Sequence, residues 1–223
     1  MLDNEHEKKM QKRIYDKFIP AFLSNLLANE LLDMDRFDDK EYINQVITEN
    51  LHLIDDIKIH VIDYNAFIDG MKSEIDQSRL KTAVVLGGTC IEHIMNHFYQ
   101  DALPLLFNLE QGEVNKAIGL LKLPDKVGWF YKITTEASLP EELVHKILEI
   151  ISLRNKIVHF QAIPELGDTK GGSHRKLNNI IESFDVPSIV VTIKELEVEL
   201  EKIKYDLWPE IEVANEIFEC LFK

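Results

Sequence analysis

Apolar residues recur three and four positions apart through most of this chain, and few helix-ending residues interrupt them. The 223 residues include nine glycines and seven prolines. Spacings of three and four place side chains on one face of an α-helix, whereas a half-buried strand needs strict alternation. Because Gly and Pro are the residues that most often end helices, their scarcity favours long helical segments. The sequence therefore predicts an all-α protein.

The expected helices follow from this spacing and from the residues that begin and end helices. A first helix spans 5–33, with a kink or break at Pro20. A strong helix over 73–101 begins at Ser73, because the acidic residues that follow favour the positive end of a helix dipole. Residues 51–70 are rich in β-branched residues, so a short strand competes there with a helix, which we favour. The other expected elements are helices over 40–49, 111–122, 140–160, 188–206 and 208–222, the last two separate or one helix kinked at Pro209, and a loop over 164–179.

Charge and cysteine content limit the class of protein. The formal net charge is −14, from 39 acidic and 25 basic residues. Such a surface does not attract nucleic acid or anionic membranes as a whole, so any RNA contact requires a local basic patch. Cys90 and Cys220 lie far apart and fit the free thiols of a cytosolic protein. No apolar run approaches the ~20 residues of a membrane span, and the charged first residues do not form a secretory signal. We therefore expect a cytoplasmic protein with no membrane partner.

Three short patterns give weaker indications. Gly87 and Gly88 match neither glycine-rich phosphate-binding motif, so we expect them to let another helix approach closely. His93 and His97 lie one helical turn apart, a spacing that can hold a metal, but no third ligand is indicated and we expect no metal site. Residues 165–178 form the most basic local patch, which is either an exposed connector or a phosphate-contacting loop. Its basic residues are Lys170, His174, Arg175 and Lys176.

The segment 149–162 places an arginine among residues typical of a core. At about 100° per helical residue, Arg154 points into the middle of an apolar arc, and Asn155 and His159 lie on an adjoining face. The arc consists of Ile147, Ile150, Ile151, Ile157 and Val158. A buried guanidinium does not lose its charge, so another group must compensate it. A carboxylate on a neighbouring helix, a side chain that reaches past its neighbours to solvent, and a cleft that binds an anion each meet this need.

The residues "SLRNKIVHF" resemble the R-x4-6-H motif of the HEPN superfamily (higher eukaryotes and prokaryotes nucleotide-binding domains). In that motif a polar residue, often Asn, usually follows the arginine, as Asn155 follows Arg154 here. A helix such as "RLKTAVVLGGTCIEHIMNHFYQ" before the motif helix also matches the HEPN order, so the resemblance covers about 75–162. It implies a HEPN-like helical bundle, commonly a two-fold dimer with the motif helices facing each other. We expect one domain over 1–223, with an N-terminal helical extension (1–70), a HEPN-like core (71–162), and a basic loop with additional C-terminal helices (163–223).

The resemblance also implies a function, because many HEPN proteins are metal-independent endoribonucleases of toxin–antitoxin, CRISPR-associated or other anti-phage systems. By position, Arg154 would stabilise charge on the scissile phosphate, and His159 would transfer protons at the ribose 2′-OH or the leaving oxygen. Asn155 would orient His159. The expected partners are an RNA substrate, a second copy of the chain, and an antitoxin or defence-system protein, and no cofactor is expected. The residues expected to contact RNA are Lys156, Lys170, Arg175 and Lys176.

Two other functions stay open. Some HEPN domains have lost catalysis and serve as protein-interaction modules, in which Arg154 would be a structural ion-pair partner. A regulator with a HEPN-like fold is the third possibility, although the net charge disfavours DNA. Some toxin members carry a modified tyrosine two residues after the histidine. Gln161 stands at that position, so this mode of regulation is not indicated.

Overall fold

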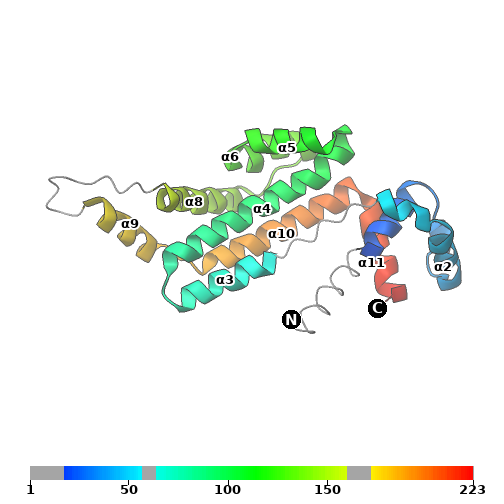
Figure 1. Ribbon diagram of the computed structural model, residues 1–223, viewed down its shortest axis with the longest axis horizontal. Coiled ribbons are helices and arrows are strands. Elements are labelled where there is room, and N and C mark those ends of the chain that lie inside the picture. The colour runs from blue at the N-terminus through cyan, green and yellow to red at the C-terminus, as the bar shows by residue number, and fades with distance from the viewer. Residues whose placement is uncertain (1–17, 57–63, 160–171, 223) are drawn as a thin grey trace. The chain divides into compact units, whose positions relative to one another are not determined.

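The computed structural model describes residues 18–56, 64–159 and 172–222, and every regular element in these ranges is a helix (Figure 1). The predicted all-α class is therefore confirmed. None of the described helices is both long and apolar enough to cross a membrane. Internal contacts divide the chain into two compact units: unit 1 comprises Met1–Ile62 with Lys202–Lys223, and unit 2 comprises Asp63–Glu201. The predicted segments do not coincide with these units, and the single-domain assignment stays a prediction.

Unit 1 joins the first and last parts of the chain around a small apolar core. Residues 18–28 are helical, and Pro20 lies buried within that helix. The helix α2 (Lys40–Glu49) has the predicted bounds, and the carboxylate of Asp39 begins it by accepting the N–H of Tyr42 at 3.0 Å. The other elements are η1 (Met34–Arg36), η2 (Leu51–Asp56) and α11 (Pro209–Phe222). The core residues are Phe22, Leu23, Leu26, Leu32, Ile43, Val46, Ala214, Ile217 and Phe218.

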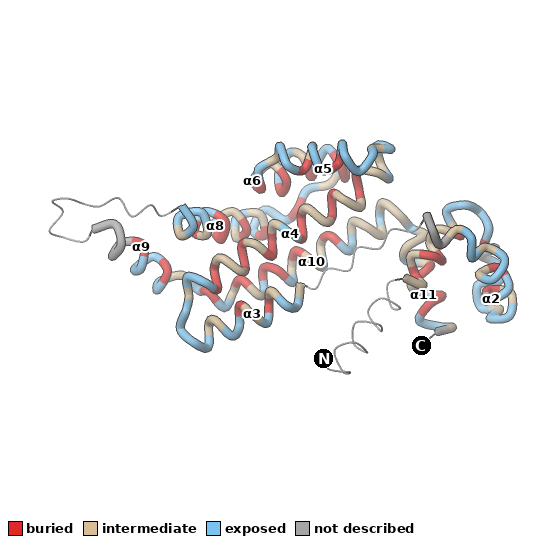
Figure 2. The backbone as a smooth tube through the Cα atoms, viewed as in Figure 1, coloured by how far each residue is buried: buried red, intermediate tan, exposed pale blue. Residues whose placement is uncertain are grey.

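Unit 2 is organised around α4 (Leu80–Phe107), and Figure 2 shows buried residues along most of this helix. The helices α3 (Tyr64–Asp76) and α8 (Glu141–Val158) pack along it. Contacts with several helices bury much of the surface of α4, so the side chains of α4 form the centre of the unit. The remaining elements are α5 (Gln111–Leu120), α6 (Leu123–Val127), α7 (Trp129–Thr135), α9 (Gly172–Ser183) and α10 (Ser188–Leu207), which ends in unit 1.

Gly87 and Gly88 allow other helices to approach α4 closely, which confirms their predicted role. A Cβ on Gly87 would lie 2.5 Å from Cγ2 of Ile189 on α10 and 3.0 Å from Sδ of Met71 on α3. A Cβ on Gly88 would lie 3.1 Å from both Cβ and Cγ of Arg154 on α8. All of these distances are shorter than ordinary van der Waals contact, so any side chain at these positions would push the helices apart.

The start of the predicted helix over 73–101 is wrong. Ser73 lies inside α3, which ends at Asp76, and α4 begins only at Leu80. Ser78 adopts a left-handed conformation with φ 58°, and its N–H donates to the carbonyl of Ile75 at 2.8 Å. This turn reverses the chain so that α3 packs back along α4. The acidic residues that resembled a helix start therefore belong to the end of the preceding helix, because packing between the two helices outweighs the local dipole effect.

The predicted loop over 164–179 is also wrong for its second half. Residues 172–179 belong to α9, which contacts both α4 and α8. Leu177 and Ile181 lie one turn apart and are both buried, so a short apolar stripe holds this helix in place. Of the ambiguous residues 51–70, those at 51–56 form η2 and those from Tyr64 belong to α3, while 57–63 lie outside the described residues. The other predicted helices agree closely with α5, α8, α10 and α11.

Candidate functional site

The last two turns of α8 carry the motif residues. The helix begins after Pro140 with Glu141 and Glu142 in its first turn, where acidic side chains favour the positive end of the dipole. It ends at Val158, and the backbone N–H of His159 donates to the carbonyl of Asn155 at 2.9 Å. Because α8 stays regular up to this point, helical geometry sets the spacing of the Arg154, Asn155 and His159 side chains.

The apolar arc around Arg154 is divided between core and surface. The helical pattern alone allowed Ile147, Ile150 and Ile151 to form a face open to a second subunit. In the structure they are buried within unit 2, so they do not form such a face. Ile157 is half-buried, and Val158 is 49% exposed. The apolar surface that this end of α8 can offer to a second copy is therefore limited to its last turn.

The guanidinium of Arg154 is only partly satisfied. Its side chain is 25% exposed, and its stem lies across Gly88 of α4. Nη2 lies 3.6 Å from Oε2 of Glu92, beyond ordinary hydrogen-bond distance, while Nη1 donates to Oδ1 of Asn155 at 3.0 Å. Nε is buried and has no hydrogen-bond partner among the described residues. A carboxylate on a neighbouring helix, one of the three expected ways to compensate the charge, is thus present, but it holds the guanidinium loosely.

Asn155 and His159 are both exposed at this end of α8. The amide oxygen of Asn155 accepts a hydrogen bond from Arg154. Within the described parts of the chain, the imidazole of His159 has neither a hydrogen-bond nor an ion-pair partner. The structure therefore brings Arg154 and Asn155 into contact and leaves the ring of His159 open to solvent, one helical turn beyond Asn155. A proton-transfer group must come within hydrogen-bond reach of its substrate, and an exposed imidazole can do so.

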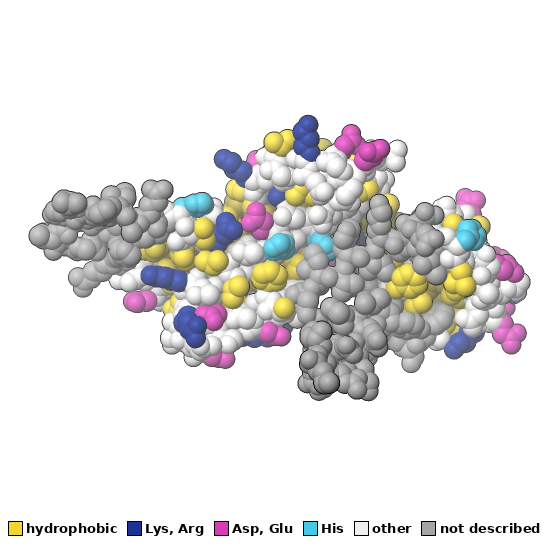
Figure 3. Space-filling view, in the orientation of Figure 1, with side chains coloured by type: hydrophobic (Ala, Val, Ile, Leu, Met, Phe, Trp, Pro, Cys, Tyr) yellow, Lys and Arg dark blue, Asp and Glu magenta, His cyan; other side chains and the backbone are white. Residues whose placement is uncertain are grey.

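A buried lysine beside this site was not indicated by the sequence. Lys126 on α6 is 3% exposed, and its Nζ donates to Oδ1 of Asn96 on α4 at 2.6 Å. Burial lowers the pKa of Lys126, and the negative charge of Glu92 opposes that shift. The hydroxyl of Tyr99 donates to the carbonyl of Lys126. The sequence signal that could have indicated a buried cation here is the pair of polar residues Glu92 and Asn96, one turn apart on the otherwise apolar α4. Figure 3 shows basic, acidic and histidine side chains close together where α4 and α8 meet on one face of unit 2.

The residues predicted to contact RNA are only partly described. Lys156 is exposed in the last turn of α8. Lys170 lies outside the described residues. Arg175 and Lys176 belong to α9, but their side chains are outside the part of the chain that the structure describes.

The histidine pair on α4 faces aromatic rings of α3. The ring of His93 lies 5.5 Å from that of Phe67, and the ring of His97 lies 6.1 Å from that of Tyr64. Across the described residues, no group of three or more His, Cys, Asp or Glu is arranged to hold a metal ion. The two histidines therefore contribute to the packing of α3 on α4.

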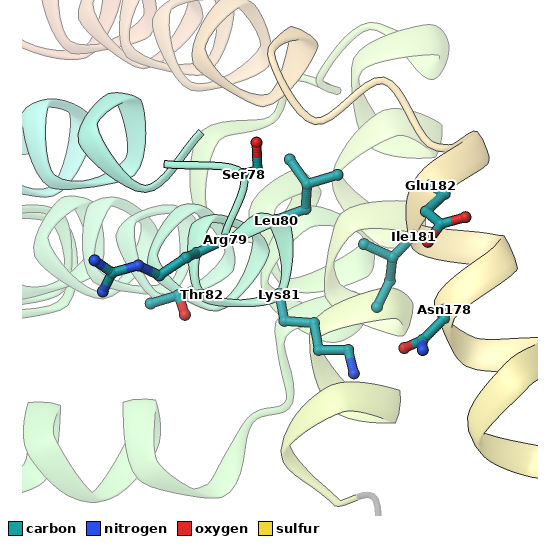
Figure 4. A pocket seen from close by; sticks show the side chains of 8 residues that line it. All are labelled: Ser78, Arg79, Leu80, Lys81, Thr82, Asn178, Ile181 and Glu182. Carbon is teal, nitrogen blue, oxygen red and sulfur yellow. The ribbon is translucent and has the colours of Figure 1, made fainter. Parts of the chain in front are cut away.

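A separate hollow of 380 Å³ lies beside the start of α4, where Asn178 and Ile181 of α9 face it (Figure 4). Lys81 and Arg79 both line it, and the side chain of Arg79 extends away from α9 and pairs with Glu74 at 3.7 Å. No residue of the R-x4-6-H motif lines this hollow, so it is distinct from the end of α8.

The end of α8 thus combines a partly satisfied guanidinium, an exposed amide and an exposed imidazole within two helical turns. Such groups can bind an anion and transfer a proton. No protein-family model, curated protein or solved structure was found to match this chain.

Proposed function

We propose that this protein is an endoribonuclease of the HEPN type, which cleaves RNA without a metal ion at a site shared by two copies of the chain. One observation carries the proposal: the last two turns of α8 hold the guanidinium of Arg154, whose Nε is unpartnered among the described residues, and the helix ends at the exposed His159. A phosphodiester needs a group that binds its non-bridging oxygens and a group that transfers protons. These are the two functions that a guanidinium and an imidazole supply.

The reaction would use the 2′-OH of the RNA as its nucleophile. His159 accepts the 2′-OH proton while the 2′-oxygen bonds to phosphorus, and the bond from phosphorus to the 5′-oxygen breaks. The leaving 5′-oxygen takes a proton from the His159 imidazolium of a second copy of the chain, and the products carry a 2′,3′-cyclic phosphate and a 5′-hydroxyl. Arg154 stabilises the negative charge on the phosphate oxygens as they become more charged.

The need for both a base and an acid favours a dimer. One imidazole cannot accept the 2′-OH proton and donate to the leaving oxygen at the same moment, whereas a second copy brings a second His159. Val158 and Ile157 at the end of α8 are the apolar residues that a second copy would cover. The same chemistry suits a toxin or an anti-phage effector, and growth arrest on expression that His159→Ala abolishes would support that role.

The test is RNA cleavage in EDTA by the wild-type chain, Arg154→Ala and His159→Ala. His145→Ala is the matched control, because His145 is an exposed histidine on the same helix but outside the motif. We expect cleavage by the wild type and by the control, and none by the two motif variants. Equal cleavage by all four proteins would refute the proposal.

The ion pair with Glu92 favours a second candidate function, a non-catalytic interaction module. In that case Arg154 is a structural residue that ties α8 to α4, at 3.6 Å from the Glu92 carboxylate. Arg154→Ala would then lower the melting temperature or dissociate the dimer, as sedimentation would show. No protein of the series would cut RNA.

A further inference from the structure

Three residues one helical turn apart on α4 form a row beneath α8 and α6. Gly88 lies under the stem of Arg154, Glu92 lies beside its guanidinium, and Asn96 accepts a hydrogen bond from Lys126. Both α6 and α8 contact α4, and they also contact each other. Glu92 therefore lies between two cations, one on each neighbouring helix.

The two cations differ in how much water they retain. The Arg154 side chain is 25% exposed, whereas Lys126 as a whole is 3% exposed and donates to a neutral amide oxygen at 2.6 Å. A buried ammonium gains more from a carboxylate than a partly exposed guanidinium does, because water screens it less. The charge of Glu92 already acts on Lys126 and favours its protonated form.

Glu92 is free to change partners. Its side chain is 41% exposed, and its contact with Arg154 at 3.6 Å is an ion pair without a hydrogen bond. Asn96, which holds Lys126, lies one turn further along the same helix, a spacing at which side chains on one helix face are neighbours. A rotation about the side-chain bonds of Glu92 would therefore carry its carboxylate from Arg154 towards Lys126.

We propose that Glu92 is an internal competitor for the anion that Arg154 binds, and that Lys126 is the positioning residue that draws Glu92 away from Arg154. Without an anion, the Glu92 carboxylate neutralises part of the guanidinium. When a phosphate arrives, Glu92 turns to Lys126, and Nη1 and Nη2 of Arg154 are presented to the phosphate oxygens. The inference rests on the proposed function only in taking this phosphate to be that of RNA.

The two roles predict a specific pattern of coupling. Removing the Glu92 charge frees Arg154, so anion binding tightens. Removing the Lys126 charge leaves Glu92 at Arg154, so anion binding weakens. If Lys126 acts through Glu92, its removal has no further effect once Glu92 is neutral. A lysine that only filled space or stabilised α6 would lower affinity equally in both backgrounds.

The experiment is a titration with inorganic phosphate, followed by the 15N NMR signal of the Arg154 side chain. The proteins are the wild type, Glu92→Gln, Lys126→Met and the double variant. We expect Glu92→Gln to lower the phosphate Kd about fivefold, the size typical of losing a half-exposed ion pair. Lys126→Met raises it by a similar factor, and the double variant matches Glu92→Gln. If Lys126→Met does not fold, Lys126→Gln keeps a hydrogen bond to Asn96 and serves in its place.

The chain offers a matched control pair on α8. Lys146 and Glu142 form an exposed ion pair outside the motif, in which Nζ lies 3.1 Å from Oε1. Lys146→Met and Glu142→Gln should therefore leave the phosphate Kd unchanged. An unchanged Kd in Glu92→Gln would overturn the inference, as would an undiminished effect of Lys126→Met in the Glu92→Gln background. If no protein cuts RNA but Glu92→Gln still binds phosphate more tightly, the proposed function fails and the inference stands. If the wild type cuts RNA but Glu92→Gln leaves the phosphate Kd unchanged, the inference fails and the proposed function stands.

Discussion

The close contact at Gly87 allows a quantitative test of the fold. In Gly87→Ala the new Cβ would lie 2.5 Å from Cγ2 of Ile189 and 3.0 Å from Sδ of Met71. Ordinary contact begins at 3.4 Å, so Ile189 must move by about 0.9 Å (3.4 minus 2.5). Both neighbours sit in the buried core of unit 2, where Ile189 and Met71 are each fully buried. The substitution therefore forces α10 and α3 away from α4.

The magnitude follows from two opposing effects. Overpacking a core costs about 1–3 kcal/mol of the free energy of unfolding. Replacing a helical glycine by alanine recovers about 0.5–1 kcal/mol, because the unfolded chain loses conformational freedom. The net loss lies between about 0 and 2.5 kcal/mol, with a midpoint of about 1.3 kcal/mol. For a protein of this size, that midpoint lowers the melting temperature by roughly 3–5 °C.

Gly119→Ala is the matched control. Gly119 lies in α5, and a Cβ there would meet nothing within 4 Å, so only the favourable helix effect remains. Thermal unfolding followed by far-UV circular dichroism should show Gly87→Ala melting below the wild type and Gly119→Ala at or slightly above it. If Gly87→Ala is as stable as Gly119→Ala, α10 and α3 do not pack on α4 as described.

Three further predictions concern buried groups in unit 2. Cys90 is fully buried, and burial together with the charge of Glu197 raises the pKa of its thiol to about 12. A thiol reagent should therefore label only the exposed Cys220 until the chain unfolds. Rapid labelling of both thiols in the folded chain would contradict this prediction. Burial lowers the pKa of Lys126 in the folded chain below the ordinary 10.5 of the unfolded chain. At pH values between the lowered pKa and 10.5, the unfolded chain binds more protons than the folded chain, so the free energy of unfolding rises with pH. Urea unfolding at several pH values should show that Lys126→Met lacks this rise. If the free energy of unfolding changes with pH equally in the wild type and in Lys126→Met, Lys126 is not its cause. Tyr99→Phe removes the donor to the buried carbonyl of Lys126 and should cost about 1–3 kcal/mol in urea unfolding, whereas an unchanged midpoint would show that this hydrogen bond contributes nothing.

Local patterns were sufficient to predict the bounds of α2, α5, α8, α10 and α11 closely. The bounds of α2 follow from the carboxylate of Asp39 and the apolar spacing behind it. The same reasoning failed at Ser73, because a run of acidic residues looks alike at the start of one helix and at the end of another. What separates α3 from α4 is the left-handed Ser78 and the packing of the two helices on each other. That packing depends on residues distant in sequence.

The candidate site could be predicted only in part. The helical arc around Arg154 showed that this residue needs a compensating group, but the group is Glu92 on another helix, which no local pattern identifies. Lys126 was missed because it follows a Pro–Asp pair that is typical of an exposed turn. Its burial arises from the packing of the short helix α6 against α4 and α8.

The proposed function requires that Arg154 and His159 at the end of α8 cut RNA through its own 2′-OH. Mass spectrometry of RNA incubated with the chain in EDTA tests it most directly, alongside the same RNA with a single 2′-deoxy substitution at the cleaved position. We predict 2′,3′-cyclic phosphate and 5′-hydroxyl ends from the wild-type chain, none from His159→Ala, and no cleavage at the 2′-deoxy position. Intact RNA with the wild-type chain, or equal cleavage by His159→Ala, would refute the proposed function.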